Sequence, residues 1–331
     1  MKIMVYEAPP DLRADLEKQA ALHGVELSVT DAVPTLENAS LAAGCIGVSI
    51  LGQGCIDAAL LDAYHALGIR YLSTRTIGYD HIDLDHARSI GLRVCSASYA
   101  PNGVADFTVM MILMCLRHYK QALWRGQVND FSLTGLQGRE MKDLTIGIIG
   151  TGRIGAQVVR NLSGFGCRIL AYDLRRNPAV EPQVTYVDFD TLLAQSDVIT
   201  LHMPLLDSNR HIINRESVAK MRDGVVIVNC SRGELADIEA LIEGIETGKI
   251  GALGMDTVEG DEGIIHADHR VDILPNRNWF YLHQFRNVIM TQHMAFYTDA
   301  AVSSMVDCGI GGICQMAAGE SCPTELTGPV Q

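Results

Sequence analysis

Residues 144–155 read LTIGIIGTGRIG, a buried strand that runs directly into a glycine-rich turn. Gly150, Gly152 and Gly155 form the pattern G-x-G-x-x-G, and residues 156–162 have the composition of a helix. In such a unit the first glycine permits a tight turn, the second lets the backbone approach a pyrophosphate, and the third lets the helix pack on the strand. The stretch therefore predicts a dinucleotide-binding strand–turn–helix unit.

A second apolar run, residues 167–172, follows the expected helix and ends at Asp173. A carboxylate at this position can bind both hydroxyls of an adenosine ribose and would repel a 2′-phosphate, so the sequence favours NAD over NADP. Arg175 and Arg176 come next and are able to tolerate a 2′-phosphate. We interpret these two arginines as part of a solvated loop.

Composition excludes several classes of function. The formal net charge is −13, and no run of Lys and Arg offers the basic face that nucleic acids require. The N-terminal apolar run is too short for a signal peptide, and residues 109–116 are too few to cross a bilayer. The nine cysteines are scattered with no C-x-x-C pair, which indicates reduced thiols and no metal site. We therefore expect a cytoplasmic protein that binds neither nucleic acid nor membranes.

Strand and helix patterns alternate on both sides of the glycine-rich stretch, which indicates α/β domains with parallel sheets. We expect a doubly wound NAD-binding domain over residues 101–298, inserted into a discontinuous substrate domain formed by residues 1–100 and 299–331. Residues 104–124 are apolar nearly all round and predict one long buried helix. Residues 125–143 are expected to form an arm that can reach a partner subunit, and residues 259–287 an irregular segment.

Several polar side chains follow the expected strands, where ligands bind in open α/β sheets. These residues are Arg75, Asp173, His202, Arg232, Asp256 and His293. A nicotinamide enzyme that acts on a carbonyl needs a guanidinium to bind the substrate, a histidine to protonate the oxygen, and an acid to orient that histidine. Residue types alone leave the alternative open that the arginine and histidines are structural.

The order of the motifs favours the catalytic interpretation. The motifs are GTGRIG (150–155), LHMPL (201–205), NCSRGEL (229–235), GMDTVEG (254–260) and TQHMAFYT (291–298), with STRTIGYDHID (73–83) and SYAPNGVADF (98–107) before them. In this order they resemble the D-2-hydroxyacid dehydrogenase family over essentially the whole chain, and most closely its D-lactate dehydrogenase branch. The resemblance implies two Rossmann-like domains, of which the substrate domain is flavodoxin-like.

The resemblance also implies the roles of individual residues. Arg232 matches the arginine that binds the keto acid, and His293 matches the acid/base histidine. Backbone amides of Ile77 and Gly78 match those that receive the substrate carboxylate. Tyr99 and Phe296 match pocket residues. Cofactor contacts are implied at Gly150, Gly152, Arg153, Ile154, Gly155, Asp173, Met203, Pro204, Asn209, Cys230, Ser231 and Asp256.

The acid that pairs with the histidine departs from the family pattern. Family members carry a glutamate five positions after the aspartate that matches Asp256, and here that position holds Asp261. Aspartate is one methylene shorter, so its contact with His293 is expected to be longer or to involve water. The alternative is a loop shifted by one residue, in which Glu262 takes this role. We favour Asp261 from the alignment of the motifs.

The implied reaction is the reduction of a 2-keto acid by NADH to the R-2-hydroxy acid, with closure of the two domains excluding water. Pyruvate is the default substrate of this branch, and branched or aromatic 2-keto acids are contenders because the residues around Tyr99 and Phe296 are apolar. A homodimer is expected. Two alternatives remain: an NADH-sensing corepressor-like protein without turnover, and a dehydrogenase of phosphorylated substrates, for which Arg75 is the obvious basic residue.

Overall fold

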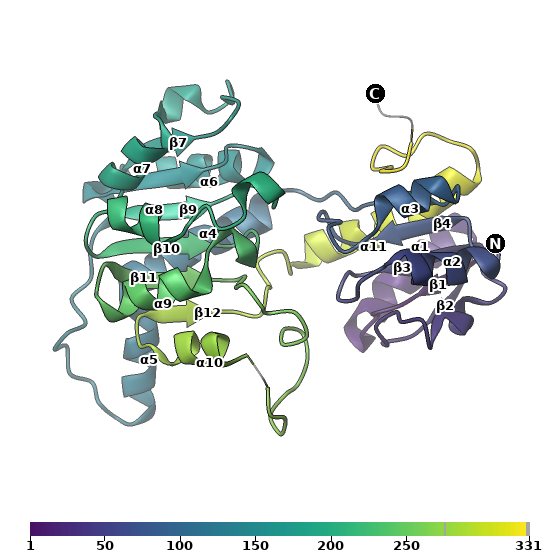
Figure 1. Cartoon of the computed structure of the whole chain (residues 1–331), viewed down its shortest axis with the longest axis horizontal. Helices are drawn as coiled ribbons and strands as arrows, with labels where there is room; N and C mark the ends of the chain where they lie inside the picture. Colours follow the sequence, from purple (N-terminus) through teal and green to yellow (C-terminus); the bar gives the residue numbers. More distant parts are fainter. Residues whose placement is uncertain (275, 329–331) are drawn as a thin grey trace. The chain divides into compact units, whose positions relative to one another are not determined.

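The computed structural model describes residues 1–274 and 276–328. The chain forms two compact units, Met1–Ala100 with Tyr297–Gln331 and Pro101–Phe296. Both units are coloured along the sequence in Figure 1. The second unit is inserted into the first, so the chain passes from one unit to the other twice.

The first unit is built on a five-stranded parallel sheet with the order β2-β1-β3-β4-β5 (Figure 1). Its strands are β1 (Lys2–Val5), β2 (Glu26–Val29), β3 (Gly47–Ile50), β4 (Tyr71–Thr74) and β5 (Arg93–Cys95). Its helices are α1 (Arg13–His23), α2 (Ala58–Ala66), α3 (Leu84–Ser89) and α11 (Asp299–Ala317). This strand order is that of flavodoxin-like folds. Helix α11 packs against α1, β3, β4 and β5, and so completes the core of the unit.

The second unit has a seven-stranded parallel sheet with the order β12-β11-β10-β9-β6-β7-β8. Its strands are β6 (Thr145–Ile149), β7 (Arg168–Tyr172), β8 (Thr185–Tyr186), β9 (Val198–Leu201), β10 (Val225–Asn229), β11 (Ile250–Met255) and β12 (Val288–Met290). Its helices are α4 (Asn102–Leu116), α5 (Tyr119–Gln127), α6 (Arg153–Ser163), α7 (Phe189–Gln195), α8 (Arg215–Lys220), α9 (Ile238–Glu246) and α10 (Arg277–Gln284). The order reverses between β6 and β9, which is the switch point where doubly wound folds bind ligands.

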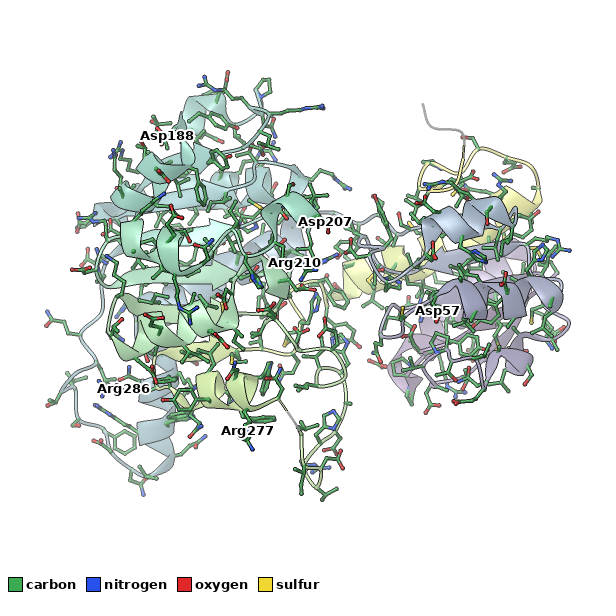
Figure 2. The ribbon with its side chains drawn as sticks, viewed as in Figure 1. Asp57, Asp188, Asp207, Arg210, Arg277 and Arg286 are labelled. Atoms are coloured by element: carbon green, nitrogen blue, oxygen red, sulfur yellow. The ribbon has the colours of Figure 1, made fainter. Side chains whose placement is uncertain are left out.

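Short polar side chains decide where many of the helices begin. Asp57 and Asp188, both labelled in Figure 2, accept hydrogen bonds from backbone amides in the first turns of α2 and α7. Thr298 does the same for Ala301 at the start of α11. Each cap satisfies an N–H group that has no partner within its own helix, which stabilises the helix by ~1 kcal/mol.

The expectation of one helix over residues 104–124 is wrong. The chain forms α4 and then α5, and the break falls at Arg117 and His118, where His118 has a φ of 50°. A left-handed residue ends the helical hydrogen-bond pattern, and the apolar composition of the run gives no sign of it. Helix α4 packs against α6, β10 and β11, which explains why it is apolar on most faces.

The segment 259–287, expected to be irregular, contains α10. Asn276 caps this helix by accepting a hydrogen bond from the amide of Trp279, and Leu282 is fully buried. Trp279 and Leu282 lie three residues apart and so share one face. The apolar residues repeat at helical spacing over too few positions to predict a helix within this long polar segment.

One helix in the described part of the chain, α11, is long and apolar enough to span a membrane by length and composition. The sequence predicts a helix at residues 300–318, but only residues 109–116 were considered there as a possible membrane span. Half of this helix is buried inside the structure, and Val306, Ile310 and Ile313 are its core residues. The apolar composition is accounted for by this packing.

Candidate active site

The glycine-rich turn follows β6 and has the geometry that the sequence predicts. Gly150 has a φ of 93°, and a Cβ atom there would lie 2.5 Å from the carbonyl oxygen of His202. A Cβ on Gly155 would lie 2.0 Å from the carbonyl oxygen of Gly150. Gly152 caps α6, so the amides of Arg153 and Ile154 are in its first turn. A helix end of this kind attracts anionic phosphates.

Asp173 is held at the tip of β7 by the same turn. One of its carboxylate oxygens accepts hydrogen bonds from the amide and hydroxyl of Thr151 at 2.6 and 3.0 Å. The other accepts from the amide of Arg175 at 3.0 Å. Arg176 lies over the ring of Tyr186 at 5.5 Å. The Asp173 carboxylate is thus held by two backbone amides and a hydroxyl group, an arrangement that fits a ribose diol better than a 2′-phosphate.

The loop after β9 carries the next predicted cofactor residues. Asn209 closes this loop, because its side chain accepts from the amide of Leu206 at 2.8 Å and donates to the carbonyl of Pro204 at 2.8 Å. Asp207, inside this loop, and Arg210, directly after it, are labelled in Figure 2. The Ser231 hydroxyl donates to the carbonyl of Met203 at 2.6 Å. Asn209 and Ser231 thus act in the structure by fixing backbone.

Arg232 lies in a tight turn after β10. The side chain of Asn229, which is fully buried, donates to the Arg232 carbonyl at 2.7 Å and accepts from the Ser231 amide at 3.0 Å. The Arg232 guanidinium donates to the Ser231 carbonyl at 2.9 Å. Sequence analysis missed Asn229, whose signal was a polar residue at the end of a fully apolar strand. Cys230, also in this turn, is buried, and burial raises its thiol pKa.

Asp256 positions the segment that carries His293. Its carboxylate accepts from the Thr291 hydroxyl at 2.6 Å and from the amides of Met294 and Ala295 at 2.9 and 2.8 Å. His293 has a φ of 52°, a strained conformation that the Asp256 hydrogen bonds on both sides of it hold in place. The sequence analysis assigned Asp256 to the cofactor, whereas the structure adds this positioning role.

His293 is half-buried and lies among other rings, of which Phe296 is half-buried and His266 is exposed. Its ring centroid is 6.2 Å from those of His266 and Phe296, and His266 Nε2 lies 3.3 Å from the His293 carbonyl oxygen. Burial lowers the pKa of His293 to about 4; the charge of Asp256 opposes this shift, and those of Arg232 and His266 add to it. These charges place Arg232, Asp256 and His293 in one electrostatic site. His266 was missed because it comes from an irregular stretch without a pattern.

The two candidate acids differ in their surroundings. Asp261 is half-buried and accepts a hydrogen bond from the Val258 amide at 3.1 Å, while Glu262 is exposed. Burial raises the pKa of Asp261 to about 6. The nearby Glu259 instead pairs with His211 at 2.6 Å, a contact that the sequence analysis did not identify.

Three predicted substrate residues belong to the first unit. Ile77 is exposed, Gly78 and Tyr99 are partly exposed, and the Gly78 carbonyl accepts from the Thr76 hydroxyl at 2.6 Å. Arg75, the basic residue suggested for phosphorylated substrates, is fully buried. It is therefore not accessible to a phosphate, which removes the support for that alternative.

The His202 side chain is structural, which is one of the two alternatives that the residue types left open. Its Nε2 lies 3.0 Å from the Thr200 hydroxyl, and burial lowers the pKa of His202 to about 3. The ring is therefore neutral near pH 7.

The residues present fit a dinucleotide. The turn at Gly150 leaves no room for a Cβ atom, α6 directs its amides outward, and Asp173 is fixed at the tip of β7. Arg232 follows β10 and His293 follows β12, so both residues lie at the carboxyl edge of the seven-stranded sheet. This combination defines a dinucleotide-dependent oxidoreductase.

Comparisons with known proteins identify the family. Residues 109–295 match the family model "D-isomer specific 2-hydroxyacid dehydrogenase, NAD binding domain". An aromatic 2-oxoacid reductase of Clostridium sporogenes is 41% identical over 311 residues, which are 93% of either chain. The apo-structure of D-lactate dehydrogenase from Escherichia coli has a TM-score of 0.89 at 36% identity, covering 98% of this chain and 100% of that one. A structure of D-2-hydroxyisocaproate dehydrogenase has a TM-score of 0.87 at 30% identity, covering 99% and 100%.

The chain belongs to the D-isomer specific 2-hydroxyacid dehydrogenases, in the branch similar to D-lactate dehydrogenase. It is an oxidoreductase, and its cofactor is NAD.

Proposed function

We propose that this dehydrogenase reduces apolar 2-keto acids, aromatic ones included, to R-2-hydroxy acids, with Arg232 binding the substrate and His293 donating the proton. The single observation that carries the proposal is the joint site of Arg232, Asp256 and His293 at the edge of the sheet that also carries the glycine-rich turn. Bound NADH supplies the hydride.

The charges around His293 suggest how its proton is gained. The Arg232 charge contributes to the low pKa of His293 in the free protein. A substrate carboxylate that pairs with Arg232 neutralises this charge, so the pKa of His293 rises when the substrate binds. The histidine is then protonated where the carbonyl oxygen needs a proton, and Asp256 holds the backbone on both sides of His293.

Aromatic and branched substrates are supported by the rings around His293. His266 and Phe296 lie within ring-contact distance of His293 and of each other, with centroids 6.2 to 6.4 Å apart. Aromatic edges and faces of this kind suit an apolar side chain on the substrate. The relative at 41% identity is named an aromatic 2-oxoacid reductase. The proposed substrates include pyruvate, because other relatives are named D-lactate dehydrogenase.

The remaining site residues are proposed from the resemblance. Ile77 and Gly78 would receive the substrate carboxylate on their amides, and Tyr99 would line the pocket. Asp261 is the proposed partner acid of His293, with Glu262 as the alternative. Asp261→Asn should lower kcat and Glu262→Gln should not, if Asp261 has this role; the reverse result would assign the role to Glu262.

The remaining cofactor contacts are also proposed. The NAD pyrophosphate would lie on Gly150, Gly152, Arg153, Ile154 and Gly155, and its adenosine ribose on Asp173. The loops around Met203, Pro204 and Asn209 and around Cys230, Ser231 and Asp256 would contact the other parts of the cofactor.

NADH oxidation against a panel of 2-keto acids tests the proposal. The panel contains pyruvate, 2-oxobutyrate, 4-methyl-2-oxopentanoate, phenylpyruvate and oxaloacetate, with NADPH as the cofactor control. We expect turnover with NADH, highest for phenylpyruvate or 4-methyl-2-oxopentanoate. Tight NADH binding without any turnover would contradict the proposal and favour an NADH-sensing, corepressor-like protein.

We also propose a homodimer in the cytoplasm. Residues 119–133 carry a row of exposed apolar side chains, Tyr119, Leu123, Trp124, Val128, Phe131 and Leu133. An exposed apolar patch of this kind is typical of a subunit interface. The nine free cysteines fit a reducing compartment. Phe131→Asp with Leu133→Asp should shift the mass measured by light scattering to that of a monomer, and Leu36→Asp, an exposed apolar site in the first unit, should not.

A further inference from the structure

Glu7 is a buried carboxylate at the carboxyl edge of the five-stranded sheet, and it comes two residues after β1. The side chain is 2% exposed, and the residue has a φ of 52°. Its carboxylate accepts hydrogen bonds from three consecutive amides, those of Leu51, Gly52 (3.0 Å) and Gln53 (2.6 Å). A carboxylate that accepts several amides is strongly held. Glu7 therefore fixes the backbone of the loop after β3, which we name the 51–53 loop.

Arg75 holds the backbone on the other side of Glu7. Its guanidinium donates to the carbonyls of Tyr6 and Glu7 at 2.8 and 2.9 Å and to the Ser49 hydroxyl at 3.2 Å. Burial lowers the pKa of Arg75 to about 10, and the charge of Glu7 opposes that shift. A buried charge is stable only with a partner and hydrogen bonds. Glu7 supplies Arg75 with a nearby opposite charge and a carbonyl acceptor, while the hydrogen bonds to the Glu7 carboxylate come from the 51–53 loop.

The 51–53 loop lies beside the turn that carries Ile77 and Gly78. Strands β3 and β4 are parallel neighbours in which Ile50 is opposite Thr74, and the Arg75 amide donates to the Ile50 carbonyl at 2.8 Å. The two loops therefore leave the sheet at the same level. A Cβ on Gly52 would lie 2.9 Å from the ring of His81, whose Nε2 is 3.3 Å from the Thr74 hydroxyl.

We propose that Glu7 is a positioning residue for the 2-keto acid: its carboxylate holds the 51–53 loop against the turn whose Ile77 and Gly78 amides receive the substrate carboxylate. This inference rests on the proposed roles of Ile77 and Gly78. Glu7 also fills a cluster of three amides that would otherwise attract the anionic substrate to the wrong place. The function of the residue is thus to direct the substrate anion as well as to order the loop.

Glu7→Gln tests the proposal, with Glu17→Gln on the exposed face of α1 as the matched control. In this variant the side-chain amide keeps one oxygen that can accept hydrogen bonds, but its NH₂ group replaces the other oxygen and faces a backbone N–H. The 51–53 loop therefore loses part of its hydrogen bonding to residue 7. We expect KM for the 2-keto acid to rise about tenfold or more, because a buried amide without an acceptor costs that much. The kcat value and the Kd for NADH, measured by fluorescence, should stay close to those of the wild type.

Glu7→Ala adds a test by rescue. This variant leaves the three amides without an acceptor, and sodium formate offers a small carboxylate in its place. Formate should lower the raised KM of Glu7→Ala, whereas in the wild type it should leave KM unchanged or raise it by competition. A KM in both Glu7 variants equal to that of the control would overturn the proposal, even if the melting temperature fell.

Gly52→Ala keeps the inference testable if the Glu7 variants do not fold. Gly52 has a φ of 98°, and an added Cβ meets the His81 ring, so the 51–53 loop shifts while Glu7 keeps its charge. KM should rise in this variant too, with NADH binding retained. An unchanged KM would contradict the inference. If the wild-type enzyme turns over no 2-keto acid, the proposed function is contradicted. If the wild type is active and the variants have the same KM, only the inference about Glu7 is contradicted.

Discussion

The first strands of the two sheets, β1 and β6, are each followed by a residue with positive φ, but the carboxylates bound near the two turns have different surroundings. After β6 the residue is Gly150, and the amide of Thr151, the next residue in this turn, donates to the carboxylate of Asp173. Soon after β1 the residue is Glu7, whose own carboxylate occupies three amides. In the glycine-rich turn the bound carboxylate is that of Asp173, the residue proposed to hold the cofactor ribose, whereas in the 51–53 loop three consecutive amides are occupied by an anion that orders the protein itself.

The largest effect is expected at the second unit, which carries His293, the proposed proton donor. His293→Gln should lower kcat by about 10²–10⁴-fold, because a general acid contributes that much, while NADH binding changes little. Stopped-flow and steady-state NADH oxidation measure kcat, and fluorescence measures the Kd for NADH.

His269→Gln is the matched control for this change, since His269 is in the same segment as His266 and pairs with Asp272 at 2.8 Å. Full activity in His293→Gln would remove His293 from the mechanism.

The role of the glycine-rich turn in NADH binding can be tested by adding a single methyl group. Gly155→Ala places a Cβ 2.0 Å from the Gly150 carbonyl oxygen, so helix α6 must move away from the turn. Overpacking of this kind costs ~1–3 kcal/mol, and the Kd for NADH should rise accordingly, by about 5-fold to more than 100-fold.

Gly164→Ala serves as the control at the other end of α6, where an added Cβ meets only one atom, at 4.0 Å. Equal NADH affinity in both variants would show that the close approach of α6 is not what forms the site.

The smallest effect concerns Asp261 and the pH dependence of stability. Burial raises the pKa of Asp261 from its ordinary value to about 6, so the folded protein binds a proton more tightly than the unfolded chain. Asp261 therefore contributes to the free energy of unfolding below about pH 4, and this contribution is lost as the pH rises through about 6. Asp261→Asn should therefore raise Tm at pH 8, by on the order of 2–4 °C per kcal/mol, and change little at pH 3.5.

Differential scanning fluorimetry at the two pH values makes this comparison, with Glu262→Gln as the exposed neighbour. A Tm for Asp261→Asn that is lower than that of the wild type at pH 8 would mean that the Asp261 carboxylate is stabilising when charged.

The sequence predicted the parts of the molecule that depend on local pattern. A buried strand was expected directly before the glycine-rich turn and is observed there as β6, and the G-x-G-x-x-G turn has the geometry that its glycines indicate. The break between α4 and α5 was missed because His118 adopts positive φ without a glycine or proline nearby. Helix α10 was missed because its apolar spacing is brief.

The structure adds what the sequence cannot show, namely contacts between distant residues. Glu7 and Gln53 are 46 positions apart, and Asp256 and Ala295 are 39 apart, yet both pairs are hydrogen-bonded. No periodicity or motif marks Glu7, which follows a short strand like many exposed acids. Its function depends on burial, and burial of a charge is decided by the packing of several elements together.

The passage of the chain into the second unit and back has a consequence for synthesis on the ribosome. Ile3, Val5 and Leu16 share a core with Val306, Ile310 and Ile313 of α11, the last helix to be made. Between them the ribosome must produce residues 101–296, which at ~5–20 residues per second takes on the order of 10–40 s. During that interval the nascent first unit exposes an apolar face, so chaperone binding there, and aggregation of chains truncated before α11, are expected features of its biogenesis.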